Sequence, residues 1–131
     1  MRVLFDADAY IAIYGHEDSS HAKAMELLEK TGTSETFTTW DVIDEVTTKL
    51  SYKISKAAAE KFLFDLAVSE TVIIYSNEDL MGRVVETFNA MRSKNVSFTD
   101  CSNIVIYEDY FIDRIFSFDK IYTKRGLRVL S

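Results

Sequence analysis

The sequence predicts a three-layer α/β/α fold, in which helices cover both faces of a central parallel sheet of four to five strands. Short runs of contiguous apolar residues recur along the chain, as in strands that are buried on both faces. Segments with apolar residues at helical spacing lie between these runs, and strands separated by helices form parallel sheets. We expect a single domain over residues 1–131, since a chain of 131 residues can bury one core and contains no Pro and only 4 Gly.

Strands and helices are expected to alternate from the first residues onward. Val3, Leu4 and Phe5 predict a buried strand over residues 2–5, and Gly15 is suited to end a helix over residues 7–14. Helical spacing of apolar residues predicts the next helix over residues 22–31. The other expected strands cover residues 36–39, 72–75, 115–118 and 127–130, and the other expected helices cover residues 40–51, 55–69, 77–91 and 99–110.

Composition and charge exclude several classes of protein. The hydrophobic share of 47% argues against disorder, and no run approaches the roughly 20 apolar residues of a membrane helix. The first residues lack the pattern of a secretion signal, and the single Cys101 excludes an internal disulfide and a Cys-rich zinc site. We therefore expect a cytoplasmic protein that binds no membrane. Because the formal net charge is -6, any nucleic-acid binding requires a local basic patch, although gathered carboxylates that hold a cation also fit this charge.

Acidic residues follow the predicted strands at the edge where parallel sheets bind ligands. Asp6 ends the first strand in VLFD, and Asp119 ends a later one in IFSFD. Asp100, in SFTDCSN, lies in the first turn of a helix that starts near this edge, and Glu45, in DVIDEV, lies about one turn into another. Four carboxylates in one pocket repel one another unless a divalent cation neutralises them. Oxygen ligands favour Mg²⁺ or Mn²⁺, ions that activate water against a phosphodiester.

The chain resembles the PIN domain from end to end. The segments that carry the resemblance are, in order, VLFDADAYI, DSSHAKAMELL, TTWDVIDEVTTKL, SFTDCSNI and IFSFDKIYTKRGLRVL. PIN domains are small α/β/α proteins, commonly metal-dependent ribonucleases, and many are VapC-type toxins of toxin-antitoxin pairs. The resemblance implies that Asp6, Glu45, Asp100 and Asp119 are the catalytic and metal-binding acids. It also implies a Mg²⁺ or Mn²⁺ cofactor, RNA cleavage that leaves a 5′-phosphate, a small antitoxin partner and a homodimer, for which residues 54–66 are a candidate surface.

Several residues near these acids have alternative interpretations. Asp8 stands where family members usually carry Ser or Thr, and we expect it to cap the following helix or to contact the metal through water. Asp41 shares a helical face with Glu45 and is the alternative at that position. Asp109 and Asp113 are alternatives to Asp119 and otherwise surface charges.

Other polar side chains have less specific roles. Thr99 is a candidate helix cap, and Asn103 either orients water or substrate or packs inside its helix. His16 and His21 are expected to be structural or to face solvent. Basic patches for RNA phosphates are expected at Lys120, Lys124, Arg125 and Arg128, and at Lys49, Lys53 and Lys56. Trp40 and Tyr52, near the second patch, either stack on single-stranded bases or pack.

Four other functions remain open at this point. The opening DADAY is similar to the Asp-x-Asp of haloacid-dehalogenase-like phosphatases, although 131 residues leave little room for their cap. A response-regulator receiver would share the sheet, yet it needs a phospho-accepting Asp where residues 72–75 end in Tyr. Nothing in the sequence excludes a PIN nuclease of RNA processing or a PIN-like module that binds RNA or a partner without cutting.

Overall fold

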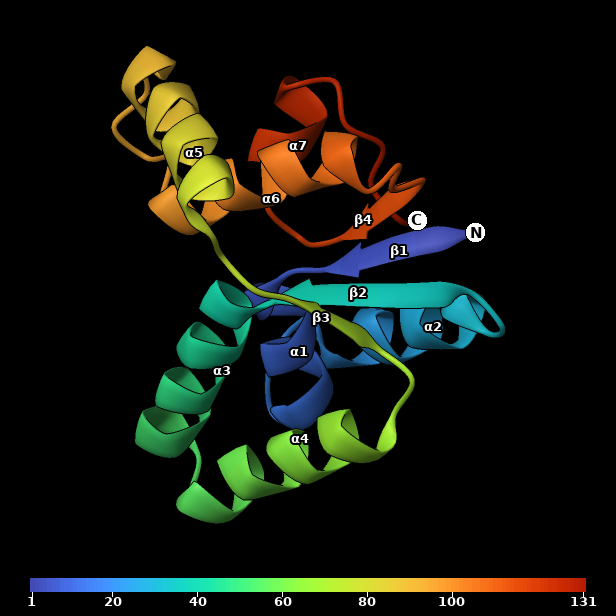
Figure 1. Cartoon of the computed structure of the whole chain (residues 1–131). Coiled ribbons are helices and arrows are strands. Elements are labelled where there is room, and N and C mark those ends of the chain that lie inside the picture. Colours follow the sequence, from blue (N-terminus) through green and yellow to red (C-terminus); the bar gives the residue numbers. More distant parts are fainter.

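The computed structural model describes residues 1–131 and confirms the three-layer α/β/α architecture (Figure 1). Its strands are β1 (Arg2–Phe5), β2 (Glu35–Thr39), β3 (Val72–Ile74) and β4 (Arg114–Phe116). Its helices are α1 (Ala7–Tyr14), α2 (His21–Thr31), α3 (Trp40–Lys53), α4 (Lys56–Val68), α5 (Glu78–Ala90), α6 (Phe98–Asp109) and α7 (Ile121–Lys124). No helix is both long enough and apolar enough to cross a membrane.

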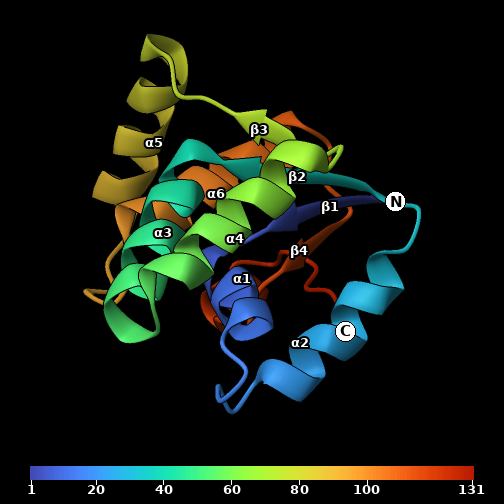
Figure 2. The same ribbon diagram turned by 90° about the horizontal axis from the view of Figure 1, so that it is seen from below.

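The four strands form one parallel sheet in the order β3-β2-β1-β4. Helices α5, α6 and α7 lie on one face, and α1 to α4 lie on the other, which Figure 2 shows from below. In this order β3 is an edge strand, and its last residue Ile74 is followed by Tyr75. This position of β3 counts against the receiver alternative, because a receiver carries its acceptor Asp on a central strand.

The sheet separates two hydrophobic cores. Val3 and Phe5 point into the core below the sheet, with α1 to α4, whereas Leu4 points into the core above it, with α5 and α6. Successive side chains of a strand point to opposite faces, so the contiguous apolar run of β1 fills both cores. Burial on both faces fixes β1 in the middle of the sheet, and its carboxyl end becomes the centre of the sheet edge.

The chain after β4 differs from the sequence-based prediction. The strand expected over residues 115–118 ends at Phe116, and the strand expected over residues 127–130 is reduced to one parallel bridge between Ile115 and Val129. The early end of β4 is explained by contacts with Asp8, a residue distant in the sequence. The Ser117 hydroxyl and the Phe118 N–H bond to Asp8, so the backbone turns away from the sheet at this point.

Candidate active site

The register of the sheet aligns the carboxyl ends of its strands. Leu4 pairs with Phe37, Phe5 with Phe116, and Thr39 with Ile74. Continuing these pairs along the strands puts Ile74, Thr39, Asp6 and Ser117 in one row across the sheet. The Asp6 N–H donates to the Phe116 carbonyl at 3.0 Å, which extends the pairing of β1 with β4 to this row. Asp6 therefore lies at the centre of the edge where parallel sheets bind ligands.

Asp6 is buried and fully engaged in hydrogen bonds. Its Oδ1 accepts from the Ala7 N–H at 2.8 Å, which makes Asp6 the N-cap of α1. The same oxygen accepts from Asn103 Nδ2 at 3.0 Å. Its Oδ2 lies 2.9 Å from the Ser117 hydroxyl and 3.1 Å from the Tyr122 hydroxyl. Residues from four separate segments thus hold one carboxylate.

Tyr122 joins Asp6 to Asp100. The Tyr122 side chain is fully buried, and its hydroxyl lies 3.1 Å from Asp6 Oδ2 and 3.2 Å from Asp100 Oδ1. Asp100 lies in the first turn of α6, where its Oδ2 accepts from the Ser97 N–H while Ser97 Oγ accepts from the Asp100 N–H. This capping box makes Ser97 the N-cap, so Thr99 does not have the capping role predicted for it. Asn103, one turn later on α6, donates to the Tyr122 hydroxyl at 3.0 Å.

Asp8 belongs to the same site but does not cap a helix. Its Oδ2 accepts from the Phe118 N–H at 2.9 Å, and its Oδ1 lies 3.1 Å from the Ser117 hydroxyl. The expected capping role falls to Asp6, and Asp8 instead ties α1 to the segment after β4. We call Asp6, Asp8 and Asp100 the acid cluster, since Ser117 and Tyr122 connect them.

Burial and neighbouring charges raise the pKa values of Asp6 and Asp8. Burial, and then the charge of Asp8, raise the pKa of Asp6 from 3.8 to about 7, with a smaller contribution from Asp100. Burial also raises the pKa of Asp8, and its hydrogen bonds to Phe118 and Ser117 oppose this shift. Burial and the charge of Asp6 raise the pKa of the Tyr122 hydroxyl, so this group stays neutral. No Lys or Arg forms an ion pair with these three acids, and their charge is uncompensated.

Asp119 and Glu45 make fewer contacts with the rest of the site than the sequence predicts. Asp119 is exposed, three residues beyond the end of β4 instead of directly after it, and its Oδ1 accepts from the Ile121 N–H at 2.9 Å. Its own N–H donates to Ser117 Oγ at 3.1 Å, and its charge raises the pKa of Asp8, so it borders the acid cluster. Glu45 is half-buried on α3 and pairs with Lys49 at 3.5 Å. No hydrogen bond joins Glu45 to the other three predicted acids.

The chemistry of these side chains suits a hard divalent cation, although they do not form a complete coordination shell. All their donor atoms are carboxylate or hydroxyl oxygens, which Mg²⁺ and Mn²⁺ prefer, and their negative charge is uncompensated. No three of the acidic, His or Cys side chains form a ready-made metal site. The hydroxyls of Ser117 and Tyr122 lie between the carboxylates, so a bound ion would take over contacts that these hydroxyls make. The carbonyl oxygen of the buried Asn103 side chain has no hydrogen-bond partner, while the Nδ2 of the same amide donates to Asp6.

The other candidate residues lie outside this site. Asp109 pairs with Arg83, and Asp113 accepts from the Arg2 N–H, as expected of surface charges. The rings of His16 and His21 lie 5.0 Å apart, and His21 Nδ1 bonds to the Ala12 carbonyl at 2.7 Å, which supports a structural role.

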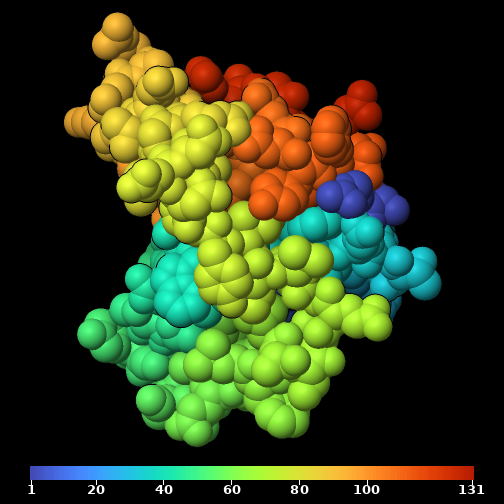
Figure 3. Space-filling view, viewed as in Figure 1, coloured from blue at the N-terminus to red at the C-terminus, as the bar shows by residue number.

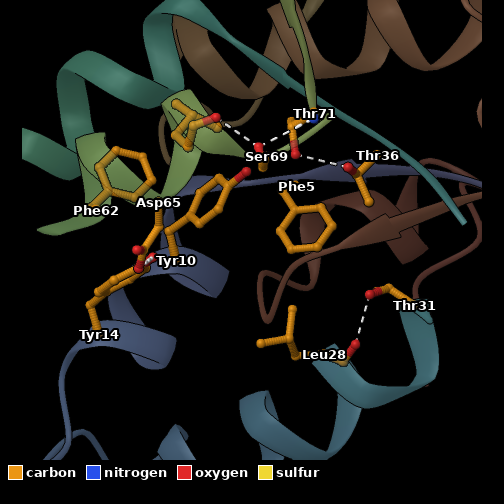
Figure 4. Close-up of a pocket in the computed structure, with 11 residues that line it drawn as sticks. Phe5, Tyr10, Tyr14, Leu28, Thr31, Thr36, Phe62, Asp65, Ser69 and Thr71 are labelled. Carbon is orange, nitrogen blue, oxygen red and sulfur yellow. Dashed lines mark hydrogen bonds between the residues drawn. The ribbon is translucent and has the colours of Figure 1, made fainter. Parts of the chain in front are cut away.

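The cavity in Figure 4 is also separate from the acid cluster. It measures about 240 Å³ and lies below the sheet, among aromatic residues that include Phe5, Tyr10 and Phe62. Its only carboxylate is that of Asp65, which accepts from the Tyr14 hydroxyl at 2.6 Å. This cavity therefore contains none of the predicted site residues.

Comparison with known proteins supports the fold. A scan against models of protein families finds no match, and a search of curated proteins finds none. A search of solved structures matches VapC20 of Mycobacterium tuberculosis, described as a toxin that cleaves the sarcin-ricin loop, with a TM-score of 0.88 over 95% of each chain. The chain has the PIN-domain fold. Sequence identity to VapC20 is 18%, so the match establishes the PIN-domain fold, and the function has to be argued from the site.

Sequence reasoning alone missed two residues of this PIN-domain site. Tyr122 follows Asp119 in the sequence, and nothing in its surroundings distinguishes it from an ordinary aromatic residue of the core. Ser117 was predicted to lie inside a strand. The sequence did contain one indication of a polar site here, because Ser117 and Asp119 are two polar residues, two positions apart, at the end of an apolar run. Asn103, for which two roles were open, contacts Asp6 and Tyr122 directly.

Proposed function

We propose that this protein is a Mg²⁺- or Mn²⁺-dependent endoribonuclease. The observation that carries the proposal is the acid cluster, in which segments far apart in the sequence bring buried carboxylates together without any cationic side chain. Such a cluster is unfavourable unless a proton or a cation neutralises it. The PIN-domain fold and the toxin VapC20, which cleaves RNA, support the same reaction.

In the proposed mechanism Asp6, Asp8 and Asp100 hold the ion, and Asp119 and Glu45 complete the site from its rim. When bound, the ion polarises the phosphodiester and lowers the pKa of water. Tyr122 and Asn103 orient Asp6 and Asp100 by hydrogen bonds, and the helices α1 and α6 fix the two carboxylates at their N-termini. Lys120, Lys124 and Arg125 are exposed, form no ion pairs and flank Tyr122, so they are available to contact RNA phosphates.

The first prediction concerns cleavage. We expect the protein to cut RNA with Mn²⁺, to lose activity in EDTA, and to lose it in Asp100→Asn and Asp119→Asn. Because Asp100 is proposed as a ligand, Asp100→Asn should lower the cleavage activity by more than the roughly 10- to 100-fold that is typical of a substitution outside the ligand shell. Gel analysis of labelled RNA measures this. Asp44→Asn, which changes an exposed acid on α3, is the matched control and should cleave normally.

Cleavage that persists in EDTA and in both variants would contradict the proposal. Binding of RNA without cleavage would favour the second candidate, a PIN-like module that does not cut, for which the hydroxyls between the carboxylates are the supporting observation. The phosphatase alternative has no support from the structure search, and it requires a covalent aspartyl-phosphate to be trapped on Asp6.

We propose further that the protein is the toxin of a type II toxin-antitoxin pair and acts on RNA as a homodimer. The support is the match to a toxin over 95% of each chain. We expect an adjacent gene to encode a small protein that copurifies with this chain, inhibits its nuclease activity and places a basic side chain against the acid cluster. Coexpression with each neighbouring gene, followed by affinity purification and the cleavage assay, tests this. If no neighbouring product binds, the toxin assignment is wrong, whereas the nuclease assignment stands.

A further inference from the structure

Two exposed aromatic side chains stand beside the acid cluster at the carboxyl edge of the sheet. Trp40 directly follows the end of β2, and Tyr75 directly follows the end of β3. Trp40 is 57% exposed and Tyr75 is 59% exposed, and their ring centroids lie 5.7 Å apart. In Figure 3 the start of α3 and the segment after β3 meet on the visible surface. We call this pair the aromatic platform.

The register of the sheet relates the aromatic platform to Asp6. Thr39 and Ile74 lie in the row of Asp6, so Trp40 and Tyr75 lie one residue beyond it. Neighbouring strands are about 4.8 Å apart, so Thr39 is about one strand spacing from Asp6 and Ile74 about two, and the aromatic residues each follow one of these positions. At the roughly 3.4 Å per nucleotide of one strand in a DNA duplex, about three nucleotides cover two strand spacings. An RNA whose phosphodiester lies at Asp6 therefore brings its neighbouring bases to the platform.

The surroundings of the platform favour a flat, neutral ring as its occupant. The exposed residues that follow Tyr75 are Ser76, Asn77, Glu78 and Asp79, and Asp44 is exposed one turn after Trp40. An acidic and polar rim disfavours a phosphate or an acidic peptide on the rings themselves, so an RNA would contact the platform through the uncharged face of a base. A protein interface generally needs more than about 1,000 Å² of buried surface, which two rings within a polar surface do not supply. Bases stack on aromatic side chains without sequence preference.

We infer that Trp40 and Tyr75 stack on an unpaired base next to the phosphodiester that is cleaved. This inference rests on the proposed function, since it takes RNA as the substrate. It assigns to the protein a requirement for single-stranded nucleotides at the cleavage site, because a base in a duplex presents no free face to the platform. The platform binds and positions the substrate, and it takes no part in bond cleavage.

Trp40 is the only Trp of the chain, so its fluorescence reports directly on the platform. Short single-stranded RNA, titrated in EDTA to prevent cleavage, is expected to quench this fluorescence to saturation, and the same RNA annealed to its complement is expected to bind more weakly. Tyr75→Ala should raise the Kd by about 5- to 150-fold, and Tyr75→Phe should restore it, because stacking needs the ring and not the hydroxyl. Phe111→Ala, which removes an aromatic ring that is 81% exposed and lies before the start of β4, away from the carboxyl ends of the strands, is the matched control and should bind normally.

A cleavage assay separates this inference from the proposed function. With single-stranded RNA and Mn²⁺, Tyr75→Ala should raise KM and leave kcat unchanged, as expected when binding shared by ground and transition states is lost. Equal Kd values for Tyr75→Ala and the unsubstituted protein, or equal binding of duplex and single strand, would overturn the platform even if the protein cleaves RNA. Quenching that depends on Tyr75 in a protein that never cleaves RNA would support the platform and reject the nuclease. Quenching by a copurifying protein instead of by RNA would overturn it in favour of a protein contact.

Discussion

Asp6→Asn is expected to raise the free energy of unfolding at pH 8 in the absence of metal, while it removes the proposed nuclease activity. Burial and the neighbouring Asp8 raise the pKa of Asp6 to about 7 in the folded protein, from 3.8. A group whose pKa is raised by folding makes its full contribution to stability at pH values below its pKa in the unfolded chain. This contribution is lost as the pH rises through its pKa in the folded protein. At pH 8 the charged Asp6 therefore costs up to about 4 kcal/mol relative to an uncharged side chain.

Asparagine suits this position because it resembles the protonated acid. Its Oδ1 can accept from Ala7 and Asn103 as the aspartate does, and its Nδ2 can donate to the hydroxyl oxygens of Ser117 and Tyr122. The increase in the free energy of unfolding should be largest at pH 8. It should be small below pH 4, where the Asp6 side chain is mostly protonated in the unfolded chain as well as in the folded protein. Urea unfolding in EDTA over this pH range measures the difference between the two proteins.

Asp44→Asn is again the control, because it removes an exposed carboxylate outside the acid cluster. A difference for Asp6→Asn that does not grow between pH 5 and pH 8 would mean that Asp6 is not strained by its charge. The usual trade-off between stability and activity would then have no basis in this residue.

Tyr122→Phe is expected to lower the free energy of unfolding by about 3 kcal/mol and to weaken cleavage. The Tyr122 hydroxyl is the group that separates Asp6 from Asp100, and it also accepts from Asn103. Its removal costs a hydrogen bond to a carboxylate, worth about 1.5 to 3 kcal/mol, and leaves one of the two N–H groups of the buried Asn103 amide without an acceptor, while the other still donates to Asp6. The loss should be greater at pH 8 than at pH 5, because the hydroxyl stabilises the ionised form of Asp6 more than the neutral form.

Tyr107→Phe is the matched control for this change. The Tyr107 hydroxyl accepts from the N–H of Arg128, an exposed contact that water can replace. Urea unfolding at the two pH values, together with kcat and KM on RNA, tests the prediction. If the two variants lose the same stability, the buried hydroxyl has no special role in holding the carboxylates.

The order of strands and helices could be predicted from the sequence because local patterns encode it. The contiguous apolar residues of β1 and the helical spacing in the chain indicate the layers, and side chains such as Asn77 and Ser55 mark helix starts by capping them. The end of β4 could not be predicted, because the bonds that end it come from Asp8, at the other end of the chain.

The sequence by itself determined that Asp6 and Asp100 lie near the same edge of the sheet. Asp6 directly follows a buried strand, and Asp100 lies in the first turn of a helix that starts at this edge. Only the tertiary structure decided which groups surround them. Tyr122, Ser117 and Asn103 reach Asp6 through strand pairing and helix packing, and Glu45 contacts Lys49 instead. Trp40 and Tyr75 likewise meet because β2 pairs with β3. Local propensity acts over a few residues, whereas these contacts depend on packing between segments that the sequence keeps far apart.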